Sequence, residues 1–262
     1  MLFDVVYRTD SLGRRLTPRE TIVAPTRHAL FFGCSATFGE GVEDRDTLPA
    51  QFERLRPSFR AYNYGFCGWG PQQAFEWTLD PSLPSQIAEP EGVAIYTYLV
   101  GHEDRAIGRM SVVTSWGRSM PCWELERDGS LARTGSFASA HPLRQKLYEI
   151  AARSEILRYL SIDLPLRRSD DSFRLVARLL RATANEYGKA FPRGRFYVVI
   201  SPSASPGIRI LPYLKSEGLR VLDYSRLFDP MALGLFIEGD RHPTPEAYRL
   251  MAERLAADTA SP

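Results

Sequence analysis

The sequence is poor in the features that mark secreted, membrane-spanning or nucleic-acid-binding proteins. It has three cysteines in 262 residues, too few for a disulfide framework, and their spacing fits no zinc motif. No stretch approaches the roughly 18 consecutive apolar residues of a membrane span. A formal net charge of +2 gives no reason to expect nucleic acid or an anionic membrane surface as a partner. What remains is an ordinary globular composition, with 44% hydrophobic and 24% charged residues.

The first residues also lack the basic region and apolar segment of a signal peptide. Together with the scarcity of cysteine, this slightly favours a reducing, cytoplasmic compartment. A fragment of a longer, anchored protein stays open as an alternative, and the sequence predicts no oligomeric state. Cys34 and Cys67 lie in two loops of interest, so a redox-sensitive pair is a further alternative.

Short apolar runs alternate with segments of helical periodicity along the chain. The strands are predicted at residues 29–32, 59–64, 92–100, 195–200 and 219–222. The helices are predicted at residues 48–55, 71–77, 143–160, 172–187 and 208–217, and a last one opens at Thr244-Pro245. Such alternation predicts a mostly parallel five-stranded sheet with helices on both faces, a three-layer α/β/α sandwich of flavodoxin-like type. The economical reading is a single domain over residues 1–262.

Two segments fall outside this pattern. In residues 1–26, loose alternation from Phe3 to Tyr7 and a turn cluster at 9–13 predict a small β-hairpin laid against the domain. Residues 109–141 contain scattered Trp, Pro, Gly and Ser, and Asp128-Gly129 is a hairpin signal. We expect an irregular, β-rich insertion there.

The polar groups that could carry chemistry follow the predicted strands. Ser35 lies just after the first strand, and the carboxyl ends of parallel strands are where such sheets bind ligands. We therefore predict Ser35 as a nucleophile, His242 as its base and Asp240 as the carboxylate that orients the base. Asp240 could instead be a carboxylate at a helix N-terminus, in which case Glu238 would orient His242.

An acyl-transfer site also needs donors for the oxyanion. The backbone N–H groups of Ser35 and Gly68 are predicted to supply two, because glycine permits close approach. The ring of His102, after the strand at 92–100, could add a third or be a satisfied buried imidazole. Three further residues are candidates for substrate contact: Trp69, Glu103 and Arg105. Arg105 could equally form an ion pair with Glu103 or Asp104, and Trp69, Trp116 and Trp123 could wall a pocket or pack in the core.

In their order along the chain, these segments resemble the motif blocks of the SGNH (GDSL-type) hydrolase superfamily. Gly33-Cys34-Ser35-Ala36-Thr37-Phe38-Gly39 resembles Gly-Asp-Ser-x-Thr-x-Gly, Asn63-Tyr64-Gly65-Phe66-Cys67-Gly68 resembles the second block, and Asp240-Arg241-His242-Pro243 resembles the closing block. The resemblance implies an SGNH-type fold, with Ser35 as nucleophile, Gly68 as oxyanion donor, and His242 and Asp240 as the other triad members.

Three departures from the family pattern stand out. Cys34 replaces the aspartate before the serine, and a single residue separates Asp240 from His242 instead of the commoner two. The third block, Gly-x-Asn-Asp, is Gly101-His102-Glu103-Asp104 here, so the oxyanion-binding asparagine is missing and His102 or Glu103 stands in its place. Loss of one such donor implies weak or specialised activity.

The function implied by the resemblance is a serine esterase that cleaves a short acyl ester of a carbohydrate or another small molecule. No metal, cofactor or nucleic acid is implied. An O-acyltransferase with the same triad is one alternative. Another is a binding protein that kept the fold without turnover. A nucleotide-binding domain is disfavoured because no Gly-x-Gly-x-x-Gly follows the first strand.

Overall fold

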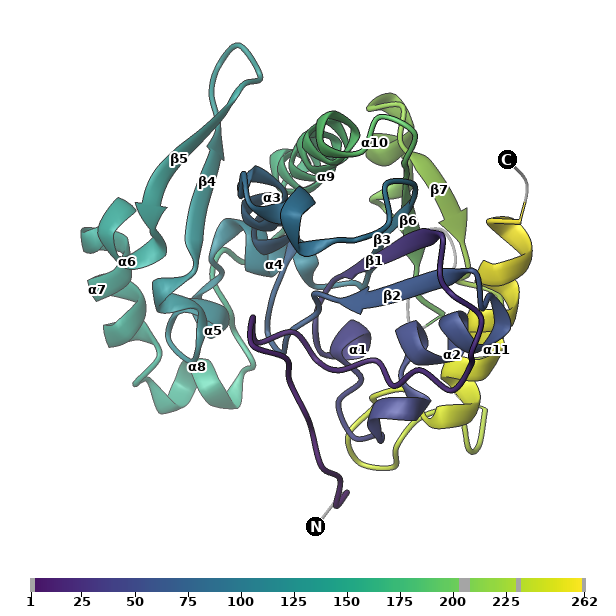
Figure 1. The fold of residues 1–262 in the computed structure, drawn as a ribbon. Helices are drawn as coiled ribbons and strands as arrows, with labels where there is room; N and C mark the ends of the chain where they lie inside the picture. Colours follow the sequence, from purple (N-terminus) through teal and green to yellow (C-terminus); the bar gives the residue numbers. More distant parts are fainter. Residues whose placement is uncertain (1–2, 203–207, 230–231, 261–262) are drawn as a thin grey trace.

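A computed structural model describes residues 3–202, 208–229 and 232–260, and its centre is a five-stranded sheet in which every neighbouring pair is parallel (Figure 1). The strand order is β2-β1-β3-β6-β7. The strands are β1 (Arg27–Phe32), β2 (Phe59–Asn63), β3 (Gly92–Tyr98), β6 (Arg195–Ile200) and β7 (Arg220–Asp223). All five lie where the apolar runs predict them.

Helices cover both faces of this sheet, which confirms the predicted three-layer α/β/α sandwich (Figure 1). One face carries α3 (Pro71–Leu79), α4 (His102–Ile107), α9 (Asp170–Ala190) and α10 (Leu211–Ser216). The other carries α2 (Leu48–Leu55) and α11 (Pro245–Asp258). The shorter elements of the sandwich are α1 (Ser35–Phe38), η1 (Asp44–Asp46) and η2 (Leu83–Gln86).

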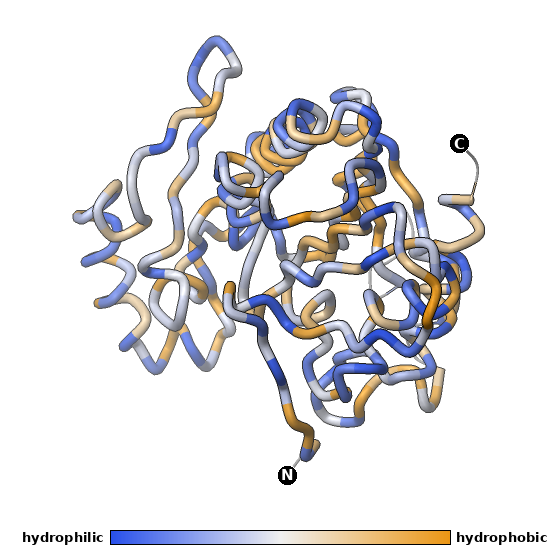
Figure 2. The backbone as a smooth tube through the Cα atoms, viewed as in Figure 1, coloured by the Kyte–Doolittle hydropathy of each residue, from blue (hydrophilic) through white to orange (hydrophobic). Residues whose placement is uncertain are grey.

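The sheet buries both of its faces, so the strands read as continuous apolar runs. Side chains alternate across the sheet: Leu30 and Phe32 enter the core beneath α3 and α9, whereas Ala29 and Phe31 enter the core beneath α2 and α11. Figure 2 shows the corresponding hydrophobic colouring along the central strands. None of the helices in the described ranges has the length and apolar character needed to cross a bilayer.

The insertion contains the predicted hairpin but extends well beyond residue 141. Strands β4 (Pro121–Leu125) and β5 (Leu131–Ser136) pair antiparallel across the turn at Asp128-Gly129. Short helices surround them: α5 (Met110–Val113), η3 (Gly117–Ser119), α6 (Phe137–Ala140), α7 (Pro142–Ala151) and α8 (Glu155–Tyr159). The helix predicted over 143–160 is therefore two helices. It breaks because the Ser154 hydroxyl accepts from the Leu157 amide and caps a new helix.

The predicted N-terminal hairpin is wrong in its extent. Within the described residues 3–26 the structure has a turn at 10–13, closed by an isolated antiparallel bridge between Thr9 and Arg15, and a second isolated bridge joins Arg15 to Asn63 of β2. The segment is extended and is held to the domain by arginine side chains in place of a strand ladder.

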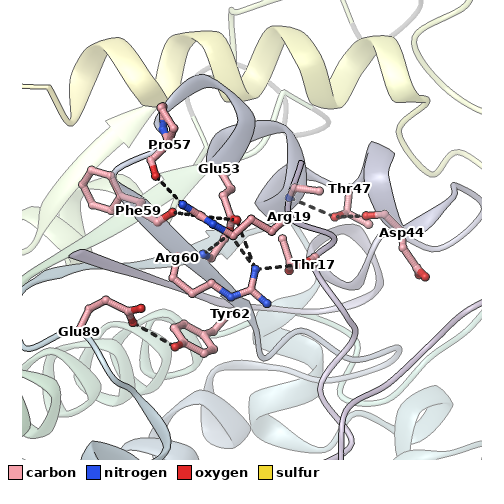
Figure 3. Close-up of polar contacts among 12 residues, drawn as sticks. Thr17, Arg19, Asp44, Thr47, Glu53, Pro57, Phe59, Arg60, Tyr62 and Glu89 are labelled. Atoms are coloured by element: carbon pink, nitrogen blue, oxygen red, sulfur yellow. Dashed lines mark hydrogen bonds and ion pairs between the residues drawn. The ribbon is translucent and has the colours of Figure 1, made fainter. Parts of the chain in front are cut away.

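One of these anchors is centred on the buried carboxylate of Glu53 in α2 (Figure 3). Glu53 accepts from Arg19 of the N-terminal segment at 2.7 Å, from Arg60 of β2 at 3.0 Å and from the Ala61 amide at 2.7 Å. Arg60 also donates to the Thr17 carbonyl at 2.9 Å. The carboxylate thus joins the N-terminal segment, α2 and the edge strand β2.

The second anchor is Arg15, whose side chain is fully buried. Its Nε donates to Asp44 at 2.9 Å, and its Nη atoms donate to the carbonyls of Phe38, Gly39 and Val42. The guanidinium also lies over the ring of Tyr7, 4.5 Å from the centroid. Arg15 therefore satisfies the carbonyls at the end of α1 and the loop after it.

We predict that Arg15→Met lowers the free energy of unfolding by about 3 kcal/mol or more, since it leaves Asp44 and three carbonyls without their donor. Arg8→Met is the matched control, because Arg8 also pairs with Asp44 but is 64% exposed, and it should cost under about 1 kcal/mol. Urea unfolding monitored by circular dichroism measures both. Equal losses in the two variants would contradict the assignment.

His28 on β1 gives the fold a pH dependence. It is buried, its Nδ1–H donates to the Glu89 carbonyl at 2.7 Å, and its Nε2 accepts from the Tyr187 hydroxyl at 2.7 Å. Burial lowers the pKa of His28 to about 4, so the folded state holds a neutral ring. Below about pH 6.5 the unfolded chain binds a proton that the folded chain does not, and stability falls as pH decreases towards 4.

From this pKa shift, lowering the pH from 7.5 to 5 should cost about 2 kcal/mol through His28 alone. The variant His28→Gln should lose that part of the pH dependence, whatever its stability at pH 7.5. Urea unfolding of both proteins at the two pH values provides the comparison. An identical pH effect in wild type and variant would disprove it.

Candidate active site

Ser35 opens α1 immediately beyond the carboxyl end of β1, an inner strand of the sheet, as the sequence predicts. The turn that carries it is fixed by the neighbouring strand: the Asn63 amide donates to the carbonyls of Thr37 at 3.0 Å and Phe38 at 3.3 Å. Gly65 passes so close that a Cβ there would lie 2.7 Å from Thr37 and Phe38 atoms, which explains the glycine. The serine is therefore held by β1 and β2 together.

His242 and Asp240 reach Ser35 from the loop before α11. The Ser35 hydroxyl lies 2.8 Å from His242 Nε2, and His242 Nδ1 lies 2.6 Å from Asp240 Oδ2. With Asp240 ionised, Nδ1–H donates to the carboxylate and Nε2 accepts from the serine hydroxyl. The three predicted residues are thus in contact, and Asp240, rather than the fallback Glu238, is the acid hydrogen-bonded to the histidine.

The loop geometry explains how two residues so close in sequence can meet. Arg241 between them has φ of 68°, in the left-handed region, and the Ile237 amide donates to the His242 carbonyl at 2.8 Å. Thr244 then caps α11 through its hydroxyl and closes the loop onto Gly234. The loop is closed by hydrogen bonds on both sides of the histidine.

The two predicted backbone donors are available. Within the described residues, neither the Ser35 amide nor the Gly68 amide donates to a protein acceptor. Gly68 has φ of +80°, and a Cβ on it would lie 2.6 Å from Nε1 of Trp116. Trp116 comes from the insertion, is half exposed and donates to the Gly68 carbonyl at 3.4 Å, so the insertion borders this site.

His102, the first residue of α4, is fully buried. Its Nδ1 lies 2.7 Å from the Tyr96 hydroxyl, whereas its Nε2 has no partner among the described residues. Burial and the charge of Arg105 hold the pKa of His102 well below its usual value, so the ring is neutral. The structure thus shows a buried imidazole that is half satisfied.

The three predicted substrate contacts serve the scaffold in this structure. Glu103 is buried, where it accepts from the Tyr98 hydroxyl and the Gly101 amide, and its contact with substrate stays a prediction. Arg105 donates to the Trp69 carbonyl at 2.6 Å, and Trp69 packs against Phe66. The alternative ion pair of Arg105 is not formed either, because Asp104 pairs with Arg168 at 2.7 Å and with Arg109.

The sequence analysis missed Glu40, whose carboxylate lies 3.6 Å from His242 Nε2. The Glu40 carboxylate also acts on the thiol of Cys67, whose pKa it raises, and the Gly41 amide next to it donates to the Tyr7 hydroxyl at 2.8 Å. Glu40 is five residues after Ser35 in the sequence. This closeness to the serine was the feature of the sequence that could have indicated Glu40 as a site residue. The site therefore holds two carboxylates near one imidazole.

Cys34 and Cys67 are both free thiols beside this site. Burial, the Glu40 hydrogen bond and charge, and the neighbouring Cys34 together raise the pKa of Cys67 to about 12. The thiol of Cys67 is therefore protonated at neutral pH and a poor nucleophile.

Two other features lie in the insertion, away from Ser35. A cleft of about 530 Å³ separates the hairpin β4–β5 from α4 and α9, and its lining contains none of the residues near the serine. Within the described residues, the donor atoms of Cys122, Glu124 and His141 lie within 4.8 Å of one another. Thiol, carboxylate and imidazole are ligands that zinc accepts, although the sequence predicts no metal. The hydrogen bond between His141 and Glu124, at 2.8 Å, already accounts for part of this proximity.

Comparison with known proteins identifies the fold. No family model and no curated protein matches the sequence. Among solved structures, the chain is similar to a carbohydrate esterase family 2 enzyme with a carbohydrate-binding domain from Corynascus thermopiles (Myceliophthora fergusii), with 12% identity, a TM-score of 0.51, and coverage of 95% of this chain and 69% of that one. A member of the lipolytic G-D-S-L family from Veillonella parvula matches with 12% identity, a TM-score of 0.49, and coverage of 90% and 100%. An acetyl xylan esterase from Butyrivibrio proteoclasticus matches with 10% identity, a TM-score of 0.49, and coverage of 91% and 65%.

These likenesses, at such low identity, concern the fold. The chain shares the α/β/α fold of that carbohydrate esterase family 2 enzyme.

The raised pKa of Cys67 makes a testable prediction. At pH 8, roughly one Cys67 in ten thousand is a thiolate, so iodoacetamide should modify it about a thousandfold more slowly than a free cysteine. Glu40→Gln removes the carboxylate charge and should accelerate the reaction at least tenfold. Peptide mass spectrometry follows each thiol, and Cys122, far from Glu40, is the internal control. Modification of Cys67 at the same rate in both proteins would contradict the role of Glu40.

Proposed function

We propose that this protein is a serine ester hydrolase whose triad is Ser35, His242 and Asp240. The observation that carries the proposal is the chain of contacts from the serine hydroxyl to His242 Nε2, at 2.8 Å, and from His242 Nδ1 to Asp240, at 2.6 Å. A nucleophile, a base and an orienting acid at these distances form the arrangement used in acyl transfer. Ser35 lies at the surface end of the sheet and is partly exposed, so an ester and water can both reach it.

In this mechanism Ser35 Oγ attacks the ester carbonyl while His242 Nε2 takes its proton. Asp240 keeps the proton on Nδ1 and stabilises the imidazolium that forms. The free amides of Ser35 and Gly68 donate to the oxyanion. His242 then protonates the leaving alkoxide, and a water molecule, deprotonated by the same nitrogen, releases the acid from Ser35.

His102 is proposed as the third oxyanion donor in place of the missing asparagine. When the Tyr96 hydroxyl donates to Nδ1, the proton of the neutral ring lies on Nε2, the nitrogen without a protein partner. A buried donor without an acceptor is costly unless a ligand or water completes it. Because the ring is fully buried, this role requires a small opening of the site on substrate binding.

The substrate proposed is an acyl ester of a carbohydrate or another small molecule. The structural neighbour with a TM-score of 0.51 is a carbohydrate esterase, which supports this class. Trp116 presents a half-exposed aromatic surface beside Gly68, suited to the apolar face of such a substrate. Glu40, close to His242, is placed to accept a hydroxyl of the alcohol part.

We predict that a fluorophosphonate probe labels the wild-type protein and fails to label Ser35→Ala, whereas Ser115→Ala, which replaces an exposed serine of the insertion, is labelled like wild type.

Hydrolysis of p-nitrophenyl acetate should fall about a thousandfold or more in Asp240→Asn, because His242 loses the acceptor that fixes its tautomer.

Glu238→Gln is the control for the acid and should keep near-normal rates. A larger loss of hydrolysis rate in Glu238→Gln than in Asp240→Asn would show that Glu238, and not Asp240, orients His242. A folded wild-type protein that neither binds the probe nor releases acetate would favour the binding-protein alternative. Transfer of acetyl to an added sugar in preference to water would favour an O-acyltransferase.

A further inference from the structure

The insertion exposes an apolar face on two consecutive helices. Its seven large side chains are each between 56% and 88% exposed: Leu143, Leu147, Ile150, Ile156, Tyr159, Leu160 and Leu166. On α7 they recur at spacings of four and three residues, and on α8 Ile156 and Tyr159 are three residues apart, so each helix presents them on one side. Leu160 directly follows α8, and Leu166 lies in the segment between α8 and α9. The opposite side of α7 contributes Gln145, which is buried, and Tyr148, which packs on the small core of the insertion.

A surface of this kind needs a partner. Isolated exposed leucines are ordinary, but seven large apolar side chains between residues 143 and 166 mark an interaction site. Because burial of several such side chains is favourable, the face offers enough apolar area for stable binding to a partner that accepts its flanking charges.

Those flanking charges are cationic. Lys146, Arg153 and Arg167 are exposed, and none of them forms an ion pair with any described residue. The acidic residues of the same segment are each neutralised by an arginine, in the pairs Glu149–Arg118, Glu155–Arg158 and Asp163–Arg109. The net charge of +2 for the whole chain conceals this local excess of positive charge.

The arrangement distinguishes between two occupants. In a symmetric dimer through this face, the three cations would face the same three cations of a second copy, which is repulsive. An anionic lipid surface instead supplies an apolar layer for the leucines and isoleucines and phosphates for the cations. Tyr159, 88% exposed, has the amphipathic ring that favours the headgroup level of a bilayer.

The face is also connected to the candidate active site. The Met110 amide of α5 donates to the Leu164 carbonyl at 2.8 Å, and the Ser111 hydroxyl donates to Asp163 at 2.7 Å, so α5 is tied to the chain that follows α8. Trp116, just beyond α5, reaches Gly68. Figure 1 shows α5 and α8 together on the side of the domain where the insertion lies.

We propose that the apolar face of the insertion binds peripherally to the surface of an anionic lipid bilayer. The apolar side chains enter the boundary between headgroups and acyl chains, and Lys146, Arg153 and Arg167 lie against lipid phosphates. This binding does not depend on the proposed hydrolase chemistry, since none of these residues belongs to the candidate active site.

Co-sedimentation with vesicles tests the proposal. The full chain should bind vesicles of phosphatidylcholine mixed with phosphatidylglycerol, bind pure phosphatidylcholine vesicles at least tenfold more weakly, and be released by salt. The double variant Leu147→Ser/Ile156→Ser should lower the partition coefficient at least tenfold, because it removes two inserted side chains. Leu233→Ser, which replaces a fully exposed leucine outside the insertion, should bind like wild type.

Ser35→Ala should bind the anionic vesicles as well as wild type does. The vesicle result therefore does not depend on whether the proposed hydrolase activity is found. Because Leu147, Ile156 and Leu233 are exposed, the variants at these positions should unfold at the wild-type temperature, and a thermal scan checks this. Failure of the wild type to bind the anionic vesicles, or equal binding by the double variant, would overturn the proposal. The proposal would also be overturned if the wild-type protein did not bind vesicles, formed a dimer in light scattering, and lost that dimer in the double variant.

Discussion

The structure around Ser35 depends on one buried guanidinium. Arg15 binds the carbonyls of Phe38, Gly39 and Val42 and the carboxylate of Asp44, so it satisfies the polar groups of the turn that carries the serine. Asn63 supports the same turn from β2. A four-residue helix has almost no stability of its own, and these side chains supply what the helix cannot. The N-terminal segment is thus part of the scaffold that holds the Ser35 turn.

The order of the strands explains how residues from separate loops come together beside Ser35. Because β1 lies between β2 and β3, the loops after these two strands meet on either side of Ser35. The loop after β2 brings Gly68, and α4 after β3 begins with His102. Only His242 and Asp240, the proposed base and its acid, come from elsewhere, on the loop before α11. The parallel sheet therefore gathers most of the site by topology alone.

The features that could be predicted from the sequence are those that depend on short stretches of residues, such as the strands and the motif blocks. Buried strands read as apolar runs, and Ser35, Asp240 and His242 could be recognised from their motif blocks. The sequence could not predict which partners several charged and aromatic side chains take in the fold. Glu103 and Arg105 carry charges that suggested ligands, and in the structure they bind Tyr98 and the Trp69 carbonyl. Trp116 reaches Gly68 only through folding, Glu40 is close to Ser35 in sequence but meets His242 only in the fold, and most of the strand pairing expected at the N-terminus is replaced by arginine contacts that have no periodicity.

The path of the first residues has a practical consequence. Phe3 and Ile237 both lie against Gly41, two residues from the serine turn and in the same region as the loop of His242. A side chain at Gly41 would lie 2.4 Å from Ile237 and 3.1 Å from Phe3, so a substitution there would disturb both the start of the described chain and the loop that carries His242.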